Sequence, residues 1–318
     1  MSDNNSDFYY HVPVMSDESI TYLCCHPGKT YVDCTLGGGG HSSRILKAIA
    51  PDGKLIAIDQ DLSAIENAQN SLNDKNCVLV HDNFKHIRQI LNQSYVDAVD
   101  GILADLGLSL FHIRQSGRGF SFMSDEPLDM RMNTNDSLTA RQLIHSLPEK
   151  KLAAIFRNYG EERFSNQIAR AIVKERKYQS IETTQQLCAI IHKVIPHKIK
   201  ARQKIHPATR VFMALRIAVN DELSGLQHFL DNVLSCLNPG GRLCIISFHS
   251  LEDRMVKQAM KQWESPCTCP KDLPVCLCQK EPSGKIIVRK GITPEHHEIQ
   301  TNPMARSARM RVFEKRAL

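Results

Sequence analysis

The stretch that most constrains the fold is Tyr31–Asp61, YVDCTLGGGGHSSRILKAIAPDGKLIAIDQD. β-Forming residues fill Tyr31–Leu36, and the chain then passes through consecutive glycines, which have no Cβ to hold a ligand away from the backbone. Apolar residues recur at helical spacing from His41 onward, and a buried-strand run at Leu55–Ile58 ends at Asp59. The stretch therefore predicts a strand, a glycine loop, a helix and a second strand.

The same stretch indicates a nucleotide-like ligand. Asp59 follows Gly40 by roughly the 20 residues at which such units place an acid against ribose hydroxyls. The dinucleotide fingerprint fails because Ser42 stands where its third glycine would be, and no lysine follows the loop as in a phosphate-binding P-loop. A ligand with ribose but no phosphate fits better, and S-adenosylmethionine is the obvious one. The alternative is a glycine-rich turn that binds nothing.

Composition sets the class of protein. The 318 residues suit one large or two ordinary domains, and 42% hydrophobic residues can bury a full core. No apolar run approaches the roughly 18 residues of a membrane span, and the polar start MSDNNSDF does not resemble a signal peptide. Eleven cysteines scattered through apolar segments are typical of a reducing compartment. We expect a cytoplasmic protein with no membrane association.

The strand–helix alternation continues after the glycine loop. A third strand at Cys77–Val80 leads to Phe84, which either lies against an adenine ring or packs structurally. A fourth strand at Val96–Ala104 ends in Asp105. Acids at the carboxyl ends of central strands are where such sheets hold their chemistry, so Asp105 is a candidate catalytic residue.

The alternation then breaks over residues 116–201, where only polar loop and amphipathic helices are predicted. His192–Arg216 carries seven lysines and arginines without an acid, which favours contact with nucleic-acid phosphates over a merely basic surface. We interpret residues 113–205 as a helical insertion. A long helix is predicted from Pro207 through Leu237, followed by a strand at Arg242–Phe248 and an edge hairpin of Ile286–Val288 with Arg309–Phe313.

Four cysteines gather near the carboxyl terminus as two C-x-C pairs. They are Cys267, Cys269, Cys276 and Cys278. Paired thiolates suit structural zinc, although C-x₂-C is the commoner spacing. The pattern favours thiols in a surface loop, leaves zinc open and assigns no metal.

Nine motifs carry a specific resemblance. They are HVPVM, DCTLGGGGHS, AIDQD, DLGLS, RGFSFMSDEPLDMRM, YGEERFSNQIARAIV, HPATRVFMALRIAVNDEL, PGGRLCIISFHSLEDR and NPMARSARMRVFEK, in order from Tyr10 to Lys315. The chain resembles the ribosomal RNA small subunit methyltransferase H family, the cytosine-N4 methyltransferases of bacterial 16S rRNA. The resemblance implies an α/β class I (Rossmann-like) methyltransferase sheet with an inserted all-helical domain. It also implies S-adenosyl-L-methionine as donor and a cytoplasmic, RNA-binding enzyme that acts on the small ribosomal subunit near the decoding site.

The resemblance also implies site residues and domain limits. The family's cofactor contacts fall on Gly39, Gly40, His41, Asp59, Phe84, Asp105 and His112. The methyltransferase core would comprise residues 1–112 and 206–318, with residues 113–205 recognising the substrate. Gly38 departs from the family, which often has a larger residue there and hence a tighter loop.

The expected substrate defines the remaining roles. Cytosine N4 is a poor nucleophile, so transfer needs it in line with the methyl and an acceptor for an amine hydrogen. Asp105 is predicted to be that acceptor. The Pro-Pro-aromatic sequence that follows the acid in other amino-methyltransferases is missing here, so a role in orienting the cofactor is the alternative. The RNA side of the cleft is predicted to be lined by Arg118, Arg131, His206, Arg210 and His249.

Two other classes of function remain open. A nicotinamide oxidoreductase would use the same loop and Asp59, but the missing third glycine and the basic run argue against it. A catalytically inert RNA-binding assembly factor would keep the basic segments without cofactor affinity. The sequence does not give the target nucleotide, the choice between free RNA and assembled subunit, or the oligomeric state, a homodimer included.

Overall fold

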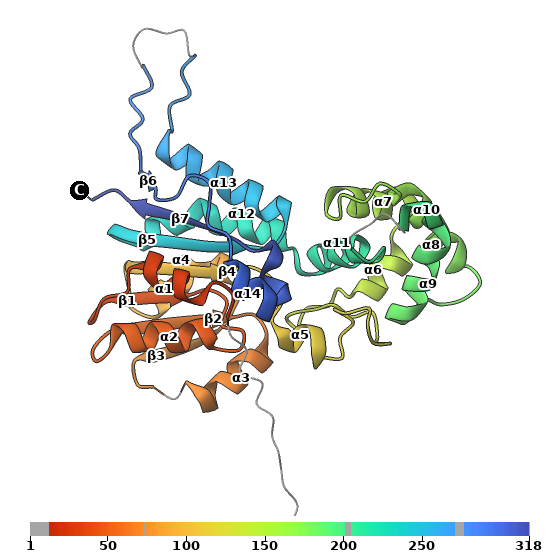
Figure 1. Ribbon diagram of the computed structural model, residues 1–318, viewed down its shortest axis with the longest axis horizontal. Helices are drawn as coiled ribbons and strands as arrows, with labels where there is room; N and C mark the ends of the chain where they lie inside the picture. The colour runs from red at the N-terminus through yellow and green to blue at the C-terminus, as the bar shows by residue number, and fades with distance from the viewer. Residues whose placement is uncertain (1–12, 73, 201–204, 271–276, 318) are drawn as a thin grey trace, which may run out of the picture. The chain divides into compact units, whose positions relative to one another are not determined.

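The computed structural model describes residues 13–72, 74–200, 205–270 and 277–317, and its ribbon is drawn in Figure 1. The chain forms two compact units. The first comprises Met1–Asp59, Ser63–Gly107 and Gln227–Leu318, and the second comprises Gln60–Leu62 with Leu108–Leu226. The second unit extends beyond the predicted insertion of residues 113–205 at both ends. The assignment of that insertion to substrate recognition stays a prediction.

The first unit is built on a seven-stranded sheet of described residues. Its strands are β1 (Thr30–Asp33), β2 (Lys54–Asp59), β3 (Cys77–His81), β4 (Val99–Asp105), β5 (Leu237–Ser247), β6 (Gly284–Ile286) and β7 (Arg309–Lys315). Their order is β3-β2-β1-β4-β5-β7-β6, and β7 runs antiparallel to both of its neighbours. The predicted class I methyltransferase sheet is thereby confirmed. The order reverses between β1 and β4, and ligands of such sheets bind at the carboxyl ends of strands beside this point.

Both faces of this sheet are covered, as β7 illustrates. Met310 and Val312 belong to the apolar cluster that includes residues of α1 (Ser16–Leu23) and α2 (Gly40–Ile49). The alternate residue Phe313 packs edge-on against Trp263 of α13 (Ser250–Glu264), with ring centroids 5.3 Å apart. Successive side chains of a strand point to opposite faces, so Met310 and Val312 are buried against one layer and Phe313 against the other.

Shorter elements complete the first unit. They are α3 (Leu62–Ser71), η1 (Phe84–His86), α4 (Ile87–Gln93), α12 (Glu222–Val233), η2 (Leu234–Cys236), α14 (His296–Thr301) and η3 (Pro303–Ser307). Both α3 and α12 have their first residues in the second unit. No helix of the described residues is long and apolar enough to cross a membrane.

The second unit is helical over its described residues. It contains α5 (Leu110–Arg114), α6 (Ala140–Ser146), α7 (Glu149–Asn158), α8 (Ser165–Glu175), α9 (Thr184–Val194), α10 (His197–Lys200) and α11 (Thr209–Asn220). Thr139 and Thr183 begin α6 and α9 as capping boxes with a glutamine three residues later. The apolar stripes of these helices meet in one core, in which Phe156, Ile168 and Leu215 are fully buried.

The predicted long helix from Pro207 through Leu237 is wrong. The chain forms α11 and α12 instead, separated at Asp221, whose φ of 49° lies in the left-handed region. A left-handed residue ends a right-handed helix, and aspartate tolerates this conformation better than most residues. The Asp221 N–H donates to the Ile217 carbonyl and closes α11.

The predicted start of the fifth strand at Arg242 is also wrong. β5 begins at Leu237, so the Asn238-Pro239-Gly240-Gly241 segment lies inside the strand rather than before it. The register against β4 shifts between Val99 and Gly101, and Gly240 has a φ of 76°. The turn-like sequence therefore forms an irregularity in the pairing and not a turn between elements.

Candidate cofactor and substrate site

Three glycines shape the loop between β1 and α2. Gly39 has a φ of 77°, in the left-handed region that favours glycine. A Cβ on Gly40 would lie 2.9 Å from the ring of Pro13, whereas a Cβ on Gly38 would meet nothing within 4 Å. The backbone conformation thus requires Gly39, the contact with Pro13 requires Gly40, and the loop is open at Gly38. An open glycine loop at the start of a helix fits a ligand that approaches the backbone.

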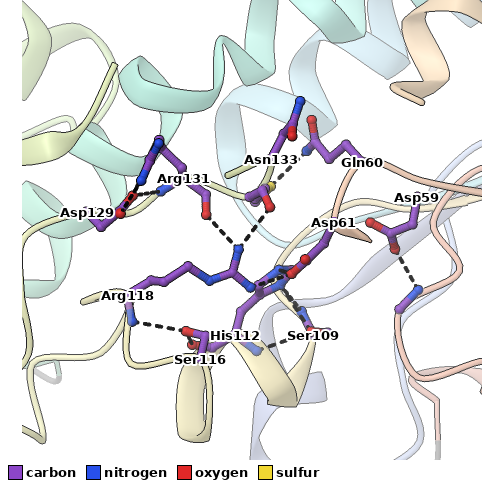
Figure 2. A network of polar contacts seen from close by, with 12 residues as sticks. Asp59, Gln60, Asp61, Ser109, His112, Ser116, Arg118, Asp129, Arg131 and Asn133 are labelled. Atoms are coloured by element: carbon purple, nitrogen blue, oxygen red, sulfur yellow. Dashed lines mark hydrogen bonds and ion pairs between the residues drawn. The ribbon is translucent and has the colours of Figure 1, made fainter. Parts of the chain in front are cut away.

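Asp59 lies at the carboxyl end of β2, beside this loop. Its carboxylate accepts a hydrogen bond from the Gly37 N–H at 2.8 Å, which Figure 2 shows. The side chain is half-buried. The loop therefore holds the carboxylate in place where the sequence predicts a ribose contact, and that contact stays a prediction.

Two acids and a histidine gather at the ends of β1 and β4. His41 Nε2 lies 3.5 Å from Asp105 Oδ2, and the His41 side chain is 5% exposed. Asp33 accepts hydrogen bonds from the Ser42 hydroxyl at 2.7 Å and from the Thr35 N–H at 3.1 Å. The network follows from topology, because β1 and β4 are neighbours whose carboxyl ends meet at the switch point.

Burial and charge act in opposite directions on the pKa of His41. Burial disfavours the imidazolium, but contact with Asp105 and the nearby charge of Asp33 outweigh it, so the pKa is raised. Burial raises the pKa of Asp33, and the charge of His41 and the Ser42 hydrogen bond only partly oppose it. The site therefore favours a cationic His41 next to the Asp105 side chain.

Some buried polar atoms of this cluster have no hydrogen-bond partner among the described residues. They are Asp105 Oδ1 and both ring nitrogens of His41. A buried acceptor without a partner costs about 1–3 kcal/mol, and such atoms are rare in native proteins. The Asp105 backbone is fixed by an N–H bond to the Thr35 hydroxyl at 2.7 Å, so its side chain is held with one oxygen available to a ligand.

Phe84 and His249 are the two other predicted site residues of the first unit that have structural contacts. The half-buried Phe84 ring packs edge-on against Phe229, with centroids 5.2 Å apart. His249 caps α13, and its Nε2 lies 3.0 Å from the Glu252 carboxylate, with only 8% of the side chain exposed. Phe84 thus has a structural contact whatever its role toward adenine, and an RNA contact of His249 stays a prediction.

The second unit contains a buried network around Asp61, drawn in Figure 2. His112 Nε2 lies 2.8 Å from Asp61 Oδ2, and Arg118 Nη2 contacts the same oxygen. The Ser109 N–H donates to His112 Nδ1, so the ring proton belongs on Nε2 and is donated to Asp61. Burial alone would raise the pKa of Asp61, but the hydrogen bonds from His112 and Arg118 lower it to about 2.

Arg118, predicted to line the RNA side of the cleft, is largely buried. Its side chain is 11% exposed, and Nη1 donates to the carbonyls of Arg131 at 3.0 Å and Met132 at 2.9 Å. Arg131 is more open and pairs with Asp129 through two hydrogen bonds of 2.7 Å. Arg118 therefore braces the loop, and the predicted RNA contacts of Arg118 and Arg131 stay predictions.

His206 and Arg210 belong to the basic run. The His206 ring stacks on Phe122, with centroids 4.4 Å apart and planes 17° apart. Burial and the neighbouring His192 lower the pKa of His206, so its neutral form is favoured. Arg210 makes one long hydrogen bond, 3.4 Å, to the Glu161 carbonyl. A neutral stacked ring beside an arginine suits unstacked RNA bases as well as phosphates.

The interpretation of the basic run as seven cations with no acid nearby is wrong for Arg216. Arg216 makes two hydrogen bonds of 2.8 Å to Glu222, six residues along the chain. Lys193 and Lys198 are exposed, as predicted for phosphate contact. Arg202, Lys204 and the side chain of Lys200 lie outside the described residues.

Sequence reasoning missed Asp61 and Asp33. Two acids occur in AIDQD, and only the one that ends the strand was weighed. Asp61 is 2% exposed because its partners come from His112 and Arg118, far along the chain. The signal for Asp33 was available, since it ends the first strand just before the glycine loop.

Comparison with known proteins gives one consistent result. The model of the MraW methylase family matches residues 8–316. The ribosomal RNA small subunit methyltransferase H of Desulfosudis oleivorans is 50% identical, over 96% of this chain and 99% of the relative. Its counterpart in Desulforapulum autotrophicum is 52% identical, over 96% and 98%. Among solved structures, an rRNA methylase from Streptococcus thermophilus is 11% identical, with a TM-score of 0.42 over 95% of each chain.

Proposed function

Because this chain belongs to the MraW methylase family, we propose that it methylates the N4 amine of a cytidine in 16S rRNA, near the ribosomal decoding site. S-Adenosyl-L-methionine is the donor. The reaction class is direct methyl transfer to an exocyclic amine. The observation that carries the proposal is Asp105 Oδ1, a buried acceptor at a strand end with no partner among the described residues.

The cofactor side is proposed to lie on the glycine loop and its neighbours. S-Adenosylmethionine, when bound, supplies a methyl group activated on a sulfonium sulfur. Gly39 and Gly40 give the loop its conformation and its close packing on Pro13, Gly38 leaves it open to a ligand, and Asp59 is placed to accept hydrogen bonds from the ribose. The remaining proposed contacts are His41, Phe84, Asp105 and His112. Ser42 supports this choice over a dinucleotide, because its hydroxyl is bound to Asp33 where a third glycine would be needed.

Asp105 is proposed to activate the amine. The N4 lone pair is delocalised into the cytosine ring, so the amine is a weak nucleophile. An acceptor that holds one N4 hydrogen would raise the electron density on nitrogen during methyl transfer, and it would take up the amine proton and pass it to solvent. Asp105 Oδ1 can accept that hydrogen, and His41 Nε2 lies 3.5 Å from the other oxygen, Oδ2. No cysteine nucleophile is needed for an exocyclic amine.

The test is Asp105→Asn. We expect tritiated methyl transfer to 16S rRNA to fall by about 10²–10⁴-fold, because the amide no longer offers an anionic acceptor. Calorimetric affinity for S-adenosylmethionine should stay within a few-fold of wild type. A loss of cofactor affinity with an unchanged rate at saturation would instead mean that Asp105 orients the cofactor. Full activity with both quantities unchanged would remove Asp105 from the site.

The RNA side is proposed to comprise Arg118, Arg131, His206, Arg210 and His249, with the exposed lysines of the basic run. A substrate in 16S rRNA places the enzyme in the cytoplasm, where ribosomal subunits are made. Substitution of Arg210 with glutamine should raise the RNA concentration needed for half-maximal rate and leave cofactor affinity unchanged. The homodimer considered from the sequence stays a prediction, which sedimentation of the full chain tests.

A further inference from the structure

The connection between α13 and β6 brings three cysteines together. The Sγ atoms of Cys267, Cys269 and Cys278 all lie within 4.8 Å of one another. Two thiolates bound to one zinc at about 2.3 Å each are about 3.8 Å apart in tetrahedral geometry. The three sulfurs are therefore spaced as the ligands of one metal ion, although Cys269 and Cys278 are nine positions apart in the sequence.

The two arms of this connection are joined at their base and again beside the cysteines. The Ser283 N–H donates to the Trp263 carbonyl at 2.8 Å. Lys280 Nζ lies 3.4 Å from Thr268 Oγ1, between the arms. Figure 1 shows the arms running out together from α13 and β6. Cys278 thus meets the other two cysteines where the same two arms make a further contact.

The apolar core does not hold these cysteines in place. None of residues 265–270 and 277–283 is buried, and Leu277 is 72% exposed. Cys34 and Cys244, in contrast, are buried within the first unit, where a thiol acts as a small apolar side chain. An exposed stem without a core must offset its ordering entropy in another way, and small modules do so with a metal or a disulfide.

We propose that the thiolates of Cys267, Cys269 and Cys278 bind one zinc ion that fixes the stem between α13 and β6. On binding, the thiols release their protons to solvent. Sulfur ligands select zinc over magnesium or calcium, and a structural zinc takes four ligands. Cys276, the remaining member of the two C-x-C pairs, lies outside the described residues. The sequence favoured thiols without a metal; the clustering of the sulfurs reverses that preference. Methyl transfer does not use this site.

Metal analysis of the full chain is the direct test. We expect the protein, purified without chelator and gel-filtered after incubation with zinc chloride, to hold about one zinc per chain. Cys267→Ser and Cys278→Ser should bring the zinc content to background. Cys188→Ser is the matched control, because Cys188 is a half-buried cysteine of α9 outside the cluster, and it should keep the metal. Background zinc in the wild-type chain, or an equal loss in Cys188→Ser, would overturn the proposal.

Two further readouts keep the outcome clear if a variant folds poorly. The wild-type chain, stripped by chelator and loaded with cobalt chloride, should show near-ultraviolet thiolate-to-cobalt charge transfer, which Cys269→Ser should lose. Chelator should also expose residues 265–283 to limited proteolysis while the far-ultraviolet circular dichroism stays unchanged. A disulfide joining two of the three cysteines in protein kept under reductant, found by peptide mass mapping, would contradict the metal site.

Discussion

Asp59 is the acid that the sequence and the loop geometry assign to the ribose of the cofactor. Asp59→Ala removes the carboxylate that the Gly37 N–H fixes beside the loop. If the Asp59 carboxylate accepts a hydrogen bond from the ribose, its removal should weaken the binding of S-adenosylmethionine by the roughly 1.5–3 kcal/mol of a charge-assisted hydrogen bond. Calorimetric titration measures this, and thermal unfolding checks that the fold is retained. An unchanged dissociation constant would remove Asp59 from the cofactor site.

Asp61 is predicted to matter for stability. Its side chain is 3% exposed and pairs with both His112 and Arg118. Asp61→Asn therefore leaves the buried guanidinium of Arg118 without its counter-ion. The variant should lose about 3–5 kcal/mol in urea unfolding. Glu149→Gln in the same unit breaks an exposed ion pair with Arg170, and should change stability by less than about 1 kcal/mol. Equal effects of the two substitutions would contradict the proposed bracing role.

We expect the Asp61 carboxylate to make the free energy of unfolding depend on pH. Its pKa is lowered from an ordinary 3.8 to about 2, so the folded state prefers the charged form. The stabilisation is fully present above about pH 4 and is lost as pH falls toward about 2. The difference in unfolding free energy between wild type and Asp61→Asn should therefore shrink by about 1.4 kcal/mol per pH unit below pH 4. A difference that stays constant down to pH 3 would show that Asp61 is not held as the anion.

At the scale of elements, the sequence predicted those helices and strands that depend on neighbouring residues alone. The glycine loop, α2 and β2 follow from four glycines, helical periodicity and a β-forming run within one short stretch. The break between α11 and α12 was not predictable, because Asp221 adopts a left-handed conformation that its residue type only permits. Likewise Asp61 has an ordinary sequence context, and its burial depends on partners more than 50 residues away.

The basic run supports a prediction about RNA binding. Lys193 and Lys198 are exposed in the second unit, whereas Arg216 is neutralised by Glu222. If both lysines contact phosphates, replacing them with glutamine should make the slope of log affinity against log salt shallower by about 1.4 for single-stranded RNA. Arg216→Gln should change that slope much less. Filter binding of a 16S rRNA fragment over a range of salt measures both, and identical slopes in all three proteins would make the run a solvated surface.

At the scale of the whole molecule, the sheet could be predicted from the sequence more readily than the site. The two compact units recruit segments that are distant in sequence: residues 60–62 belong with the insertion, and residues 227–318 complete the sheet. Most of the sheet could be predicted because β2, β3, β4 and β5 each contain an apolar run that can be recognised alone. The contacts of Asp33, Asp105 and Asp61 could not, because strand order and loop conformation decide which polar side chains meet.

The central claim is methylation of a cytidine amine in 16S rRNA. The measurement that tests it most directly is mass mapping of 16S rRNA from a strain that lacks this chain, with fragmentation that places any methyl group on the base. We predict that one cytidine near the decoding site loses a methyl from its exocyclic amine, and that the wild-type gene restores it while the Asp105→Asn variant does not. A 16S rRNA whose methylation is the same with and without the chain would contradict the claim.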